Sequence, residues 1–212
     1  MDETTSDIRD EAQLRDRYRP AHPAILGKAR PRVDPKAADF VAASPFMVLA
    51  TTSSAGTDAS PRGGPPGFVK VLDPERVAFG DLAGNNRLDS YANIVDRAEV
   101  GMLFLVPGVG ETLRINGRAS VTDDPDVCAR VAIDGVLPKV AVVVDVDECY
   151  IHCAKALRRS GLWEPDTWGE PDARPSAAEV IVDQYQLDVE PAVVEADLEQ
   201  GYQETIWTEG GR

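Results

Sequence analysis

The chain has 212 residues, enough for one domain of ordinary size with extensions, and its 22 Lys and Arg against 36 Asp and Glu give a formal charge of −14. An acidic surface repels nucleic acid and anionic lipid, so we expect neither as a partner. No apolar run approaches the roughly 20 residues of a membrane span, and the opening segment is acidic where a secretory signal would be basic and then apolar. The expectation is a cytoplasmic protein with one globular domain.

The cysteines give no sign of a disulfide framework or a metal centre. Cys128, Cys149 and Cys153 are odd in number, and they do not form the paired knuckles of a zinc site. Cys149 and Cys153 flank His152, but the sequence supplies no fourth ligand nearby. We therefore expect no bound metal.

Three segments differ in composition. Residues 1–34 are polar and contain several prolines, which is typical of an N-terminal arm, with one charged stretch from Asp7 to Tyr18 that could be helical. Residues 35–170 contain the strand-like runs of the globular domain, and residues 171–212 form an acidic extension in which two helices are expected. The first of these begins with a capping box at Ser176, and the second runs from about Pro191 to Tyr202.

Short β-branched and apolar runs predict six strands in the globular domain. The first enters a hairpin through the turn SSAGTD, and the second and third pair around Asp73-Pro74-Glu75. The last is long and valine-rich, as expected for a central strand. The six runs are residues 46–52, 68–72, 76–79, 100–106, 112–121 and 139–152.

Only short helices separate these strands. One is expected over 88–95, where apolar residues recur at helical spacing and Asn86 is the predicted N-cap, and another over 126–133. Many short strands with short helices between them favour an antiparallel barrel over a parallel βαβ sheet. The predicted fold class is therefore mostly β with short helices (α+β), an antiparallel barrel with a helical C-terminal extension.

Two clusters have the composition of a phosphate site. Arg62 lies among the glycines and prolines of residues 60–68, where an irregular backbone before a strand would allow close approach to an anion. Asn85, Asn86 and Arg87 stand at the start of the predicted helix, where unpaired N–H groups favour anions. The alternatives are a tight loop with a surface arginine for the first cluster and ordinary capping for the second.

A third cluster follows the long strand and contains His152, Cys153 and Trp163 together with Lys and Arg. This mixture suits a pocket with an aromatic wall and a cationic rim. A lone histidine at a strand end is more often structural, and Cys153 is expected to be a small buried residue rather than a nucleophile, because no partner for it can be assigned.

In this order the clusters resemble the pyridoxamine 5'-phosphate oxidase-like flavoproteins, and in particular a subgroup described as FMN-dependent. The resemblance covers Pro45 to Trp168. It is carried by the motifs SPRG-x-PPGF, GNNRLDS, LFLVPG, ETLR-x-NGRA and HC-x-KA-x-x-RS-x-LW.

The resemblance implies an FMN-binding split β-barrel that forms a homodimer, with two FMN sites at the subunit interface. Lys70 and Arg87 would hold the flavin phosphate. Thr112 would meet the isoalloxazine, and Trp163 would close the site from the second subunit. Arg62, Asn85 and Asn86 are added as further phosphate ligands.

The chain departs from true pyridoxamine phosphate oxidases at the positions that matter for vitamin B6. Pro65 stands where they have an Arg, Asn85-Asn86-Arg87 where they have Ser-Arg-Lys, and Thr112 where they have Gln. Their C-terminal Arg- and His-bearing motif is replaced here by RRSGLWEP. Oxidation of vitamin B6 is therefore not expected.

The leading hypothesis is an FMN-dependent oxidoreductase that passes a hydride or electron pair between the flavin and a small organic substrate. His152 is the candidate for delivering a proton, since its unperturbed pKa lies near neutrality. The alternatives are a flavin-binding sensor or carrier without turnover, a deazaflavin in place of FMN, and a haem protein of the same fold with His152 as axial ligand.

Overall fold

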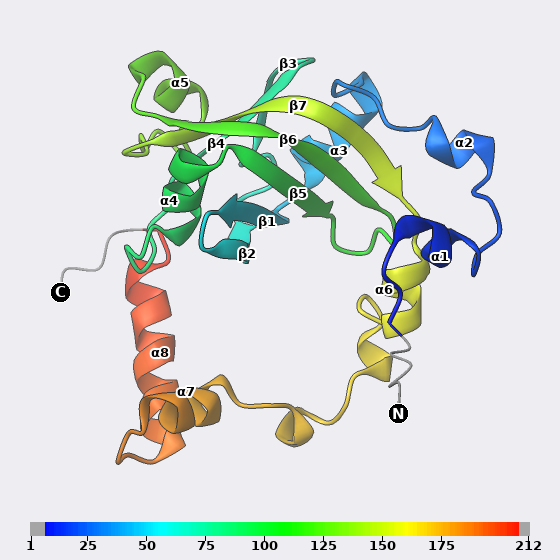
Figure 1. Cartoon of the computed structure of the whole chain (residues 1–212). Coiled ribbons are helices and arrows are strands. Elements are labelled where there is room, and N and C mark those ends of the chain that lie inside the picture. The colour runs from blue at the N-terminus through cyan, green and yellow to red at the C-terminus, as the bar shows by residue number, and fades with distance from the viewer. Residues whose placement is uncertain (1–6, 208–212) are drawn as a thin grey trace.

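In the computed structural model, which describes residues 7–207, seven strands form one antiparallel sheet that curls into a split barrel (Figure 1). The strand order is β2-β1-β5-β6-β7-β4-β3. This confirms the predicted fold class, with one strand more than expected. The strands are β1 (Phe46–Ser53), β2 (Gly56–Gly63), β3 (Lys70–Asp73), β4 (Arg76–Gly80), β5 (Glu99–Leu105), β6 (Thr112–Thr122) and β7 (Ala141–His152).

The additional strand is β2, which corrects the prediction that residues 60–68 are irregular throughout. Residues 60–63 belong to β2, where Pro61 lies opposite Val48 and Arg62 opposite Met47 of β1. β2 is an edge strand, and an edge tolerates a proline because one side of the strand needs no hydrogen bonds. The hairpin of β3 and β4 is confirmed, and the turn after β1 leads into a hairpin as predicted, with β2 as its second strand. β5 and β6 form a further hairpin.

The valine-rich strand β7 is central, as predicted, because it pairs with β6 on one side and β4 on the other. The ladder between β6 and β7 is interrupted by a bulge between Asn116 and Gly117. A side chain at Gly117 would collide with the backbone carbonyl of Asp145, so only glycine fits there. Along β7, burial falls on Val142, Val144 and Val146 before the bulge and on Cys149 after it.

The barrel core is apolar and is closed by two helices. α3 (Pro35–Ala43) buries Val41, and α4 (Asp89–Asp96) buries Tyr91 and Ile94. Transfer of such side chains out of water is the main stabilising term, at roughly 25 cal/mol per Å² of apolar surface. The most deeply buried large side chains are Phe79, Phe104, Met47, Leu49, Met102 and Ile115.

Two helix boundaries differ from the prediction. α4 begins at Asp89 with Leu88 as its N-cap, so the assignment of Asn86 as N-cap is wrong. Asn86 and Leu88 both have left-handed backbones, with φ of 58° and 60°, which turns the chain before the helix can start. α5 (Pro125–Arg130) ends earlier than predicted because Ile133 pairs with Val136 in a short β-bridge.

The extensions lie outside the barrel. The arm contains α1 (Glu11–Arg15), within the charged stretch expected to be helical, and α2 (Pro23–Leu26). After β7 come α6 (Lys155–Ser160), two short 3-10 turns (Pro165–Thr167 and Pro171–Ala173), α7 (Ala177–Tyr185) and α8 (Pro191–Thr205). Ser176 caps α7 as predicted, accepting the Glu179 N–H at 3.3 Å.

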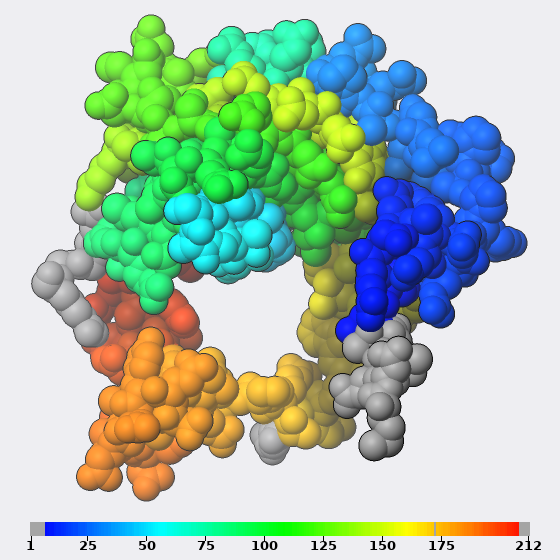
Figure 2. Space-filling model, viewed as in Figure 1, coloured from blue at the N-terminus to red at the C-terminus, as the bar shows by residue number. Residues whose placement is uncertain are grey.

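α7 and α8 form a helical hairpin outside the sheet, and α8 runs back toward α4 at its end (Figure 1). The space-filling view shows an opening between this hairpin and the barrel (Figure 2). Within residues 7–207, none of the helices has the length and apolar character needed to cross a membrane.

Candidate functional site

A cavity of about 540 Å³ lies between β2, the end of β4, the loop that follows it and the first turn of α4. β2 contributes Ser60 and Arg62, the end of β4 leads into Asp81, and α4 contributes Tyr91. Residues 82–90 also line the cavity. Asn85, Asn86 and Arg87 therefore line the same cavity as Arg62, which brings together two clusters that the sequence keeps apart.

Arg62 is the central cation of this cavity. Its guanidinium carbon lies 5.4 Å from the centroid of the Tyr91 ring, and its Nε is buried without a hydrogen-bond partner among the described residues. A buried donor left unpaired costs free energy, and a charged donor costs more than a neutral one. The cavity therefore favours a ligand that brings an anionic acceptor to Arg62.

Tyr91 and Asp81 form the cavity wall beside this arginine. The Tyr91 hydroxyl donates to Asp81 Oδ1 at 2.6 Å. Burial, followed by the hydrogen bond and negative charge of Asp81, raises the pKa of the Tyr91 phenol, while nearby Arg62 acts in the opposite direction. The phenol stays protonated at neutral pH, so it continues to satisfy one oxygen of Asp81.

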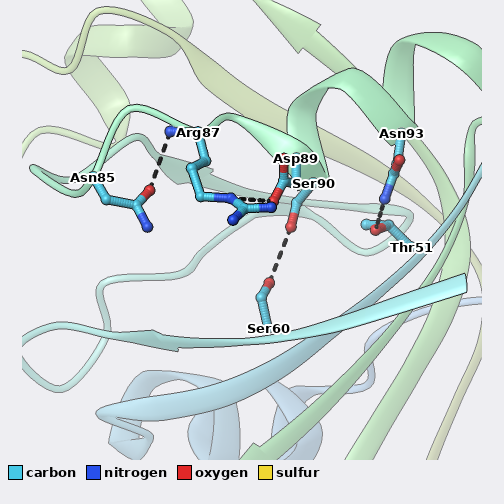
Figure 3. Close-up of polar contacts among 7 residues, drawn as sticks. All are labelled: Thr51, Ser60, Asn85, Arg87, Asp89, Ser90 and Asn93. Atoms are coloured by element: carbon cyan, nitrogen blue, oxygen red, sulfur yellow. Dashed lines mark hydrogen bonds and ion pairs between the residues drawn. The ribbon is translucent and has the colours of Figure 1, made fainter. Parts of the chain in front are cut away.

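The loop before α4 is held by its own polar contacts (Figure 3). Arg87 Nε lies 2.9 Å from Asp89 Oδ2, and the Arg87 N–H donates to Asn85 Oδ1 at 3.1 Å. The Arg87 side chain is 72% exposed, so it lies at the rim rather than in the wall. The hydroxyls of Ser60 and Ser90 are 3.0 Å apart and join β2 to α4 across the cavity floor.

A further contact fixes the helix against the sheet. Asn93 Nδ2 donates to Thr51 Oγ1 at 3.0 Å, and Thr51 is fully buried in β1 (Figure 3). A buried hydroxyl paired with an amide orients both groups, because leaving either one unpaired would cost free energy. The helix that carries Ser90 and Tyr91 is therefore anchored to β1.

The charges of the cavity are mixed. Asp58, Asp81 and Asp89 line it together with Arg62 and Arg87. Asp81 accepts the Tyr91 hydroxyl and Asp89 is paired with Arg87. Among the cavity's two cations, Arg62 is therefore the one without an ion pair to a described residue.

Lys70 is not among the residues that line this cavity. It begins β3, lies opposite Ala78 of β4 and is half-buried. Arg62, which the sequence predicted as a phosphate ligand mainly from the composition of its loop, therefore lines the cavity, whereas Lys70 does not.

The three remaining predicted residues gather at a second place, the end of the β6–β7 ladder. Thr112 is buried and lies opposite His152 in the ladder. Trp163 follows α6, and its indole Nε1 donates to the Val109 carbonyl at 2.9 Å, which places it against the loop between β5 and β6. Two strands, β1 and β5, separate the strand of Arg62 from the strand of Thr112. One chain therefore carries these residues as two separate groups.

His152 has an unusual environment for an imidazole. Its Nε2 is buried without a hydrogen-bond partner among residues 7–207, and its ring centroid lies 5.0 Å from that of Tyr150. Burial lowers the pKa of His152, and the positive charges of Arg114 and Lys28 lower it further. The imidazole is neutral at neutral pH.

The cations around His152 are held by Tyr150. Arg114 Nη1 donates to the Tyr150 hydroxyl at 3.0 Å, and Lys28 Nζ lies 4.8 Å from the centroid of the Tyr150 ring. Lys28 Nζ also donates to the Ile151 carbonyl at 2.9 Å. The N-terminal arm thus contributes to this second group, which nothing in the local sequence indicates.

Asp81 and Tyr91 also belong to the cavity, although no sequence motif singled them out. Tyr91 lies on the apolar face of the predicted helix and is buried there. Its hydroxyl donates to Asp81 in the cavity wall. A tyrosine on an inward helix face, shortly after a loop that begins with an aspartate, was the available signal.

The cysteines have separate environments. Cys149 is buried, and burial together with Asp34 raises its pKa to about 11, so it remains a protonated thiol. Cys153 is exposed, so the expectation of a buried Cys153 is wrong; it lies just past the end of β7, where the chain leaves the core. Residues 7–207 contain no group of three or more His, Cys, Asp or Glu arranged to hold a metal.

Solved structures with a similar fold have low sequence identity to this chain. HupZ from Group A Streptococcus is 13% identical over 57% of this chain and 99% of its own (TM-score 0.47). A putative pyridoxamine 5'-phosphate oxidase from Lactobacillus delbrueckii is 21% identical over 58% and 98% (TM-score 0.45). An FMN-binding protein from Syntrophomonas wolfei is 12% identical over 55% and 83% (TM-score 0.44). No curated protein sequence matches the chain.

The sequence pattern of a whole family is the stronger finding. The pattern described as pyridoxamine 5'-phosphate oxidase matches residues 33–153, more than half of the chain. The matched segment begins just before α3 and ends directly after β7, so it contains the complete barrel and the cavity. The chain belongs to the pyridoxamine 5'-phosphate oxidase-like family of split-barrel proteins.

Proposed function

We propose that this protein is an FMN-dependent oxidoreductase that acts on a small organic substrate as a homodimer, with FMN at the subunit interface. The observation that carries the proposal is Arg62, which lines a 540 Å³ cavity and whose Nε is buried without a partner among the described residues. A charged donor in such a position fits a phosphate, because charge-assisted hydrogen bonds to phosphate oxygens are among the strongest that arginine makes.

Other residues of the cavity fit the same phosphate. The hydroxyls of Ser60 and Ser90 line the cavity and are hydrogen-bonded to each other, which leaves the proton of one of them to donate to a ligand. Arg87 adds a second positive charge at the rim beside Asn85 and Asn86. A role for Lys70 in phosphate binding rests on the family resemblance alone.

The carboxylates of the cavity set a limit on this fit. Asp81 and Asp89 would repel a phosphate if they were unpaired, but the Tyr91 hydroxyl and the Arg87 guanidinium already engage them. These contacts partly compensate the negative charge of the two carboxylates, and they leave the guanidinium of Arg62 available for the phosphate.

The flavin ring would use the second group of residues. Since β1 and β5 separate Arg62 from Thr112 within one chain, the Thr112 and Trp163 that complete a site are proposed to come from the partner subunit. Trp163 would close the site with an aromatic surface, and Thr112 would offer a hydroxyl to the ring. The neutral imidazole of His152 is the candidate group for moving a proton to or from the substrate.

Bound FMN supplies the two-electron chemistry, and the protein contributes binding, orientation and exclusion of water. The same cavity would serve a sensor or carrier that binds flavin without turnover, and a deazaflavin also presents a phosphate. The departures at Pro65, Thr112 and RRSGLWEP argue that the substrate is not a B6 vitamer.

The decisive experiment compares FMN with riboflavin, which lacks the phosphate. The purified protein is stripped of ligand, the released molecule is identified by mass spectrometry, and both compounds are titrated by fluorescence quenching. FMN should bind at least about tenfold more tightly, since a charge-assisted contact contributes about 1.5–3 kcal/mol. Equal affinity for the two would show that the cavity does not hold the phosphate.

Turnover is tested separately, by reducing the FMN-loaded protein with NADH or NADPH and reoxidising it with candidate acceptors. Reduction and reoxidation over many cycles support an enzyme. Failure with every donor while FMN remains bound would favour a carrier.

Haem binding is the second candidate, and one observation favours it. The buried Nε2 of His152 is neutral and has no partner among the described residues, which is what an axial ligand to iron requires. The absorption spectrum of the purified protein distinguishes the two, because flavin gives a yellow protein and haem gives a Soret band.

A further inference from the structure

The α7–α8 hairpin, residues 177–205, is poorly covered by the rest of its own chain. Of its residues only Ala178 is fully buried, and α8 buries none of its side chains. Short helices are marginal in water unless an apolar face is packed, so this surface needs a cover. Its exposed large apolar side chains are Val180, Tyr185, Leu187, Val189, Val193 and Tyr202.

The hairpin is also uniformly acidic. Residues 175–207 contain no Lys or Arg. The charged side chains of this segment are Glu179, Asp183, Asp188, Glu190, Glu195, Asp197, Glu199 and Glu204, all of them exposed. A partner for this surface must therefore be both basic and partly apolar.

A groove with that character lies where the N-terminal arm crosses the barrel. Its volume is about 380 Å³, and Lys28, Arg30, Arg32 and Lys36 line it with Asp34 as the single acid. Arg32 is paired with Asp34 at 2.9 Å and Lys36 with Asp39 at 2.7 Å. Lys28 donates to a backbone carbonyl, which leaves its charge uncompensated there.

Arg30 is the clearest candidate for a contact with another acidic group. Its backbone is fixed by two hydrogen bonds to Cys149 of β7, of 3.1 and 2.7 Å, while its side chain is exposed and has no polar partner among the described residues. Phe40 and Leu113 add an apolar floor to the groove. The groove thus offers both the positive charge and the apolar contact that the hairpin lacks.

The hairpin and the groove of one chain do not meet. The arm and α3 lie on one side of the barrel, and α7 and α8 lie at the opposite corner of the molecule (Figure 1). Between the hairpin and the barrel is the opening seen in the space-filling view (Figure 2). This opening leaves the inner side of the hairpin accessible to a second molecule.

We infer that the α7–α8 hairpin of one copy docks on the basic groove of a second copy, and that the contact is made twice in a symmetric dimer. The inference rests on the homodimer in the proposed function but not on FMN. Reciprocal contacts of this kind are the rule for two-fold dimers, because each surface patch meets its complement on the partner. Charge complementarity directs the encounter, and the apolar side chains of the hairpin contribute contact area.

Charge reversal in the full chain tests the inference. One variant carries Arg30→Glu and Lys36→Glu, and the other carries Asp183→Lys and Glu195→Lys, all at exposed positions. Each variant alone should dimerise at least about tenfold more weakly than the wild type. In such a dimer, like charges face each other wherever a hairpin meets a groove, and this happens at both interfaces. The monomer–dimer equilibrium is measured by sedimentation velocity, and circular dichroism checks that each variant is folded.

Mixing the two variants in equal amounts is the decisive step. A mixed dimer has one reversed hairpin on a reversed groove and one wild-type hairpin on a wild-type groove. Both contacts are then attractive, so mixed dimers should form with nearly wild-type affinity. A matched control carries Glu75→Lys and Asp123→Lys, which change the net charge as the hairpin variant does but lie outside both surfaces. The control should dimerise like the wild type.

Several outcomes would overturn the inference. If folded single variants dimerise normally, or if the mixture fails to recover, the hairpin does not dock on this groove of a partner. If the mixture fails but one chain carrying all four substitutions recovers, the contact is made within a chain. A monomeric wild type would remove the homodimer as well, whereas the FMN and riboflavin titration would still report on the cavity.

Discussion

Two regions of the barrel each leave one buried side-chain nitrogen without a hydrogen-bond partner among residues 7–207. In the cavity beside α4 it is Nε of Arg62, and at the end of the β6–β7 ladder it is Nε2 of His152. Arginine remains charged at any pH of interest, whereas burial and neighbouring cations keep His152 neutral. The first region therefore requires an anionic ligand group, and the second accepts a neutral polar one.

A ligand that bridges both regions must therefore be charged at one end and neutral at the other. FMN has this character, with a phosphate at one end and an uncharged ring system at the other. Because two strands separate the regions within a chain, a site assembled from two chains is favoured. Five substitutions test this contrast.

The largest effect is expected from Arg62→Ala. Loss of its contact with the phosphate should weaken FMN binding by about 1.5–3 kcal/mol, while riboflavin binding should change little. Fluorescence titration of both compounds measures the difference. Arg118→Ala is the control, since Arg118 is exposed and paired with Glu99 away from the cavity. An equal loss for FMN and riboflavin would mean that Arg62 does not meet the phosphate.

Mixed dimers test whether the two regions combine across subunits. Trp163→Ala should weaken flavin binding by about 0.5–1.5 kcal/mol through loss of its aromatic contact. When this chain is mixed with Arg62→Ala, each mixed dimer contains one site with both residues intact and one site with neither. Titration should then show one tight FMN site per mixed dimer. Absence of any tight site after subunit exchange would place both residues of a site in the same chain.

A smaller effect is expected at the rim, from Arg87→Ala. Arg87 is exposed and already paired with Asp89, so its loss should weaken FMN binding by only about 0.2–1 kcal/mol. The paired change Asp89→Asn removes a carboxylate from the cavity and should strengthen FMN binding. If Arg87→Ala proved more costly than Arg62→Ala, the order of importance proposed for the two arginines would be reversed.

The smallest effect concerns the pH dependence of stability. The pKa of His152 in the folded protein is below its usual value of 6.5, so the unfolded chain binds more protons between those two values. The contribution of His152 to the free energy of unfolding is therefore fully present above about pH 6.5 and is lost as the pH falls through the folded pKa. His152→Gln should flatten this dependence in urea unfolding at a series of pH values. An unchanged slope would show that His152 is not held in the neutral form.

Most strands could be predicted because their residue types are those expected in a buried strand. The runs in β5 and β7 consist of β-branched and apolar residues, which is typical of buried strands. β2 was not predicted because Pro61 and Gly63 are poor strand formers. Its pairing with β1 depends on the hairpin rather than on its own composition. The N-cap of α4 was misplaced because two left-handed residues before the helix cannot be inferred from an asparagine pair alone.

The candidate site was predicted in its residue types but not in its grouping. Arg62, Asn85, Asn86 and Arg87 do meet at one cavity, yet the contrast between a half-buried Arg62 with an unpaired Nε and an exposed, paired Arg87 depends on tertiary placement. Lys28 lies far from β7 in sequence and reaches Tyr150 only because the arm crosses the barrel. Contacts of this kind leave no local pattern to read.

The bulge beside Gly117 shifts the alternation of inward-facing and outward-facing residues along β7, in the longest ladder of the barrel. Asp147 is the extra residue, since Asn116 faces Glu148 and Gly117 faces Val146. Side chains alternate between the two faces of a strand, so one inserted residue exchanges inward and outward positions for everything beyond it. Deleting Asp147 would remove the bulge and leave Cys149 in the core, whereas a regular strand that kept Asp147 would turn Cys149 outward. The bulge thus allows two exposed residues, Asp147 and Glu148, to stand between the inward-facing Val146 and Cys149.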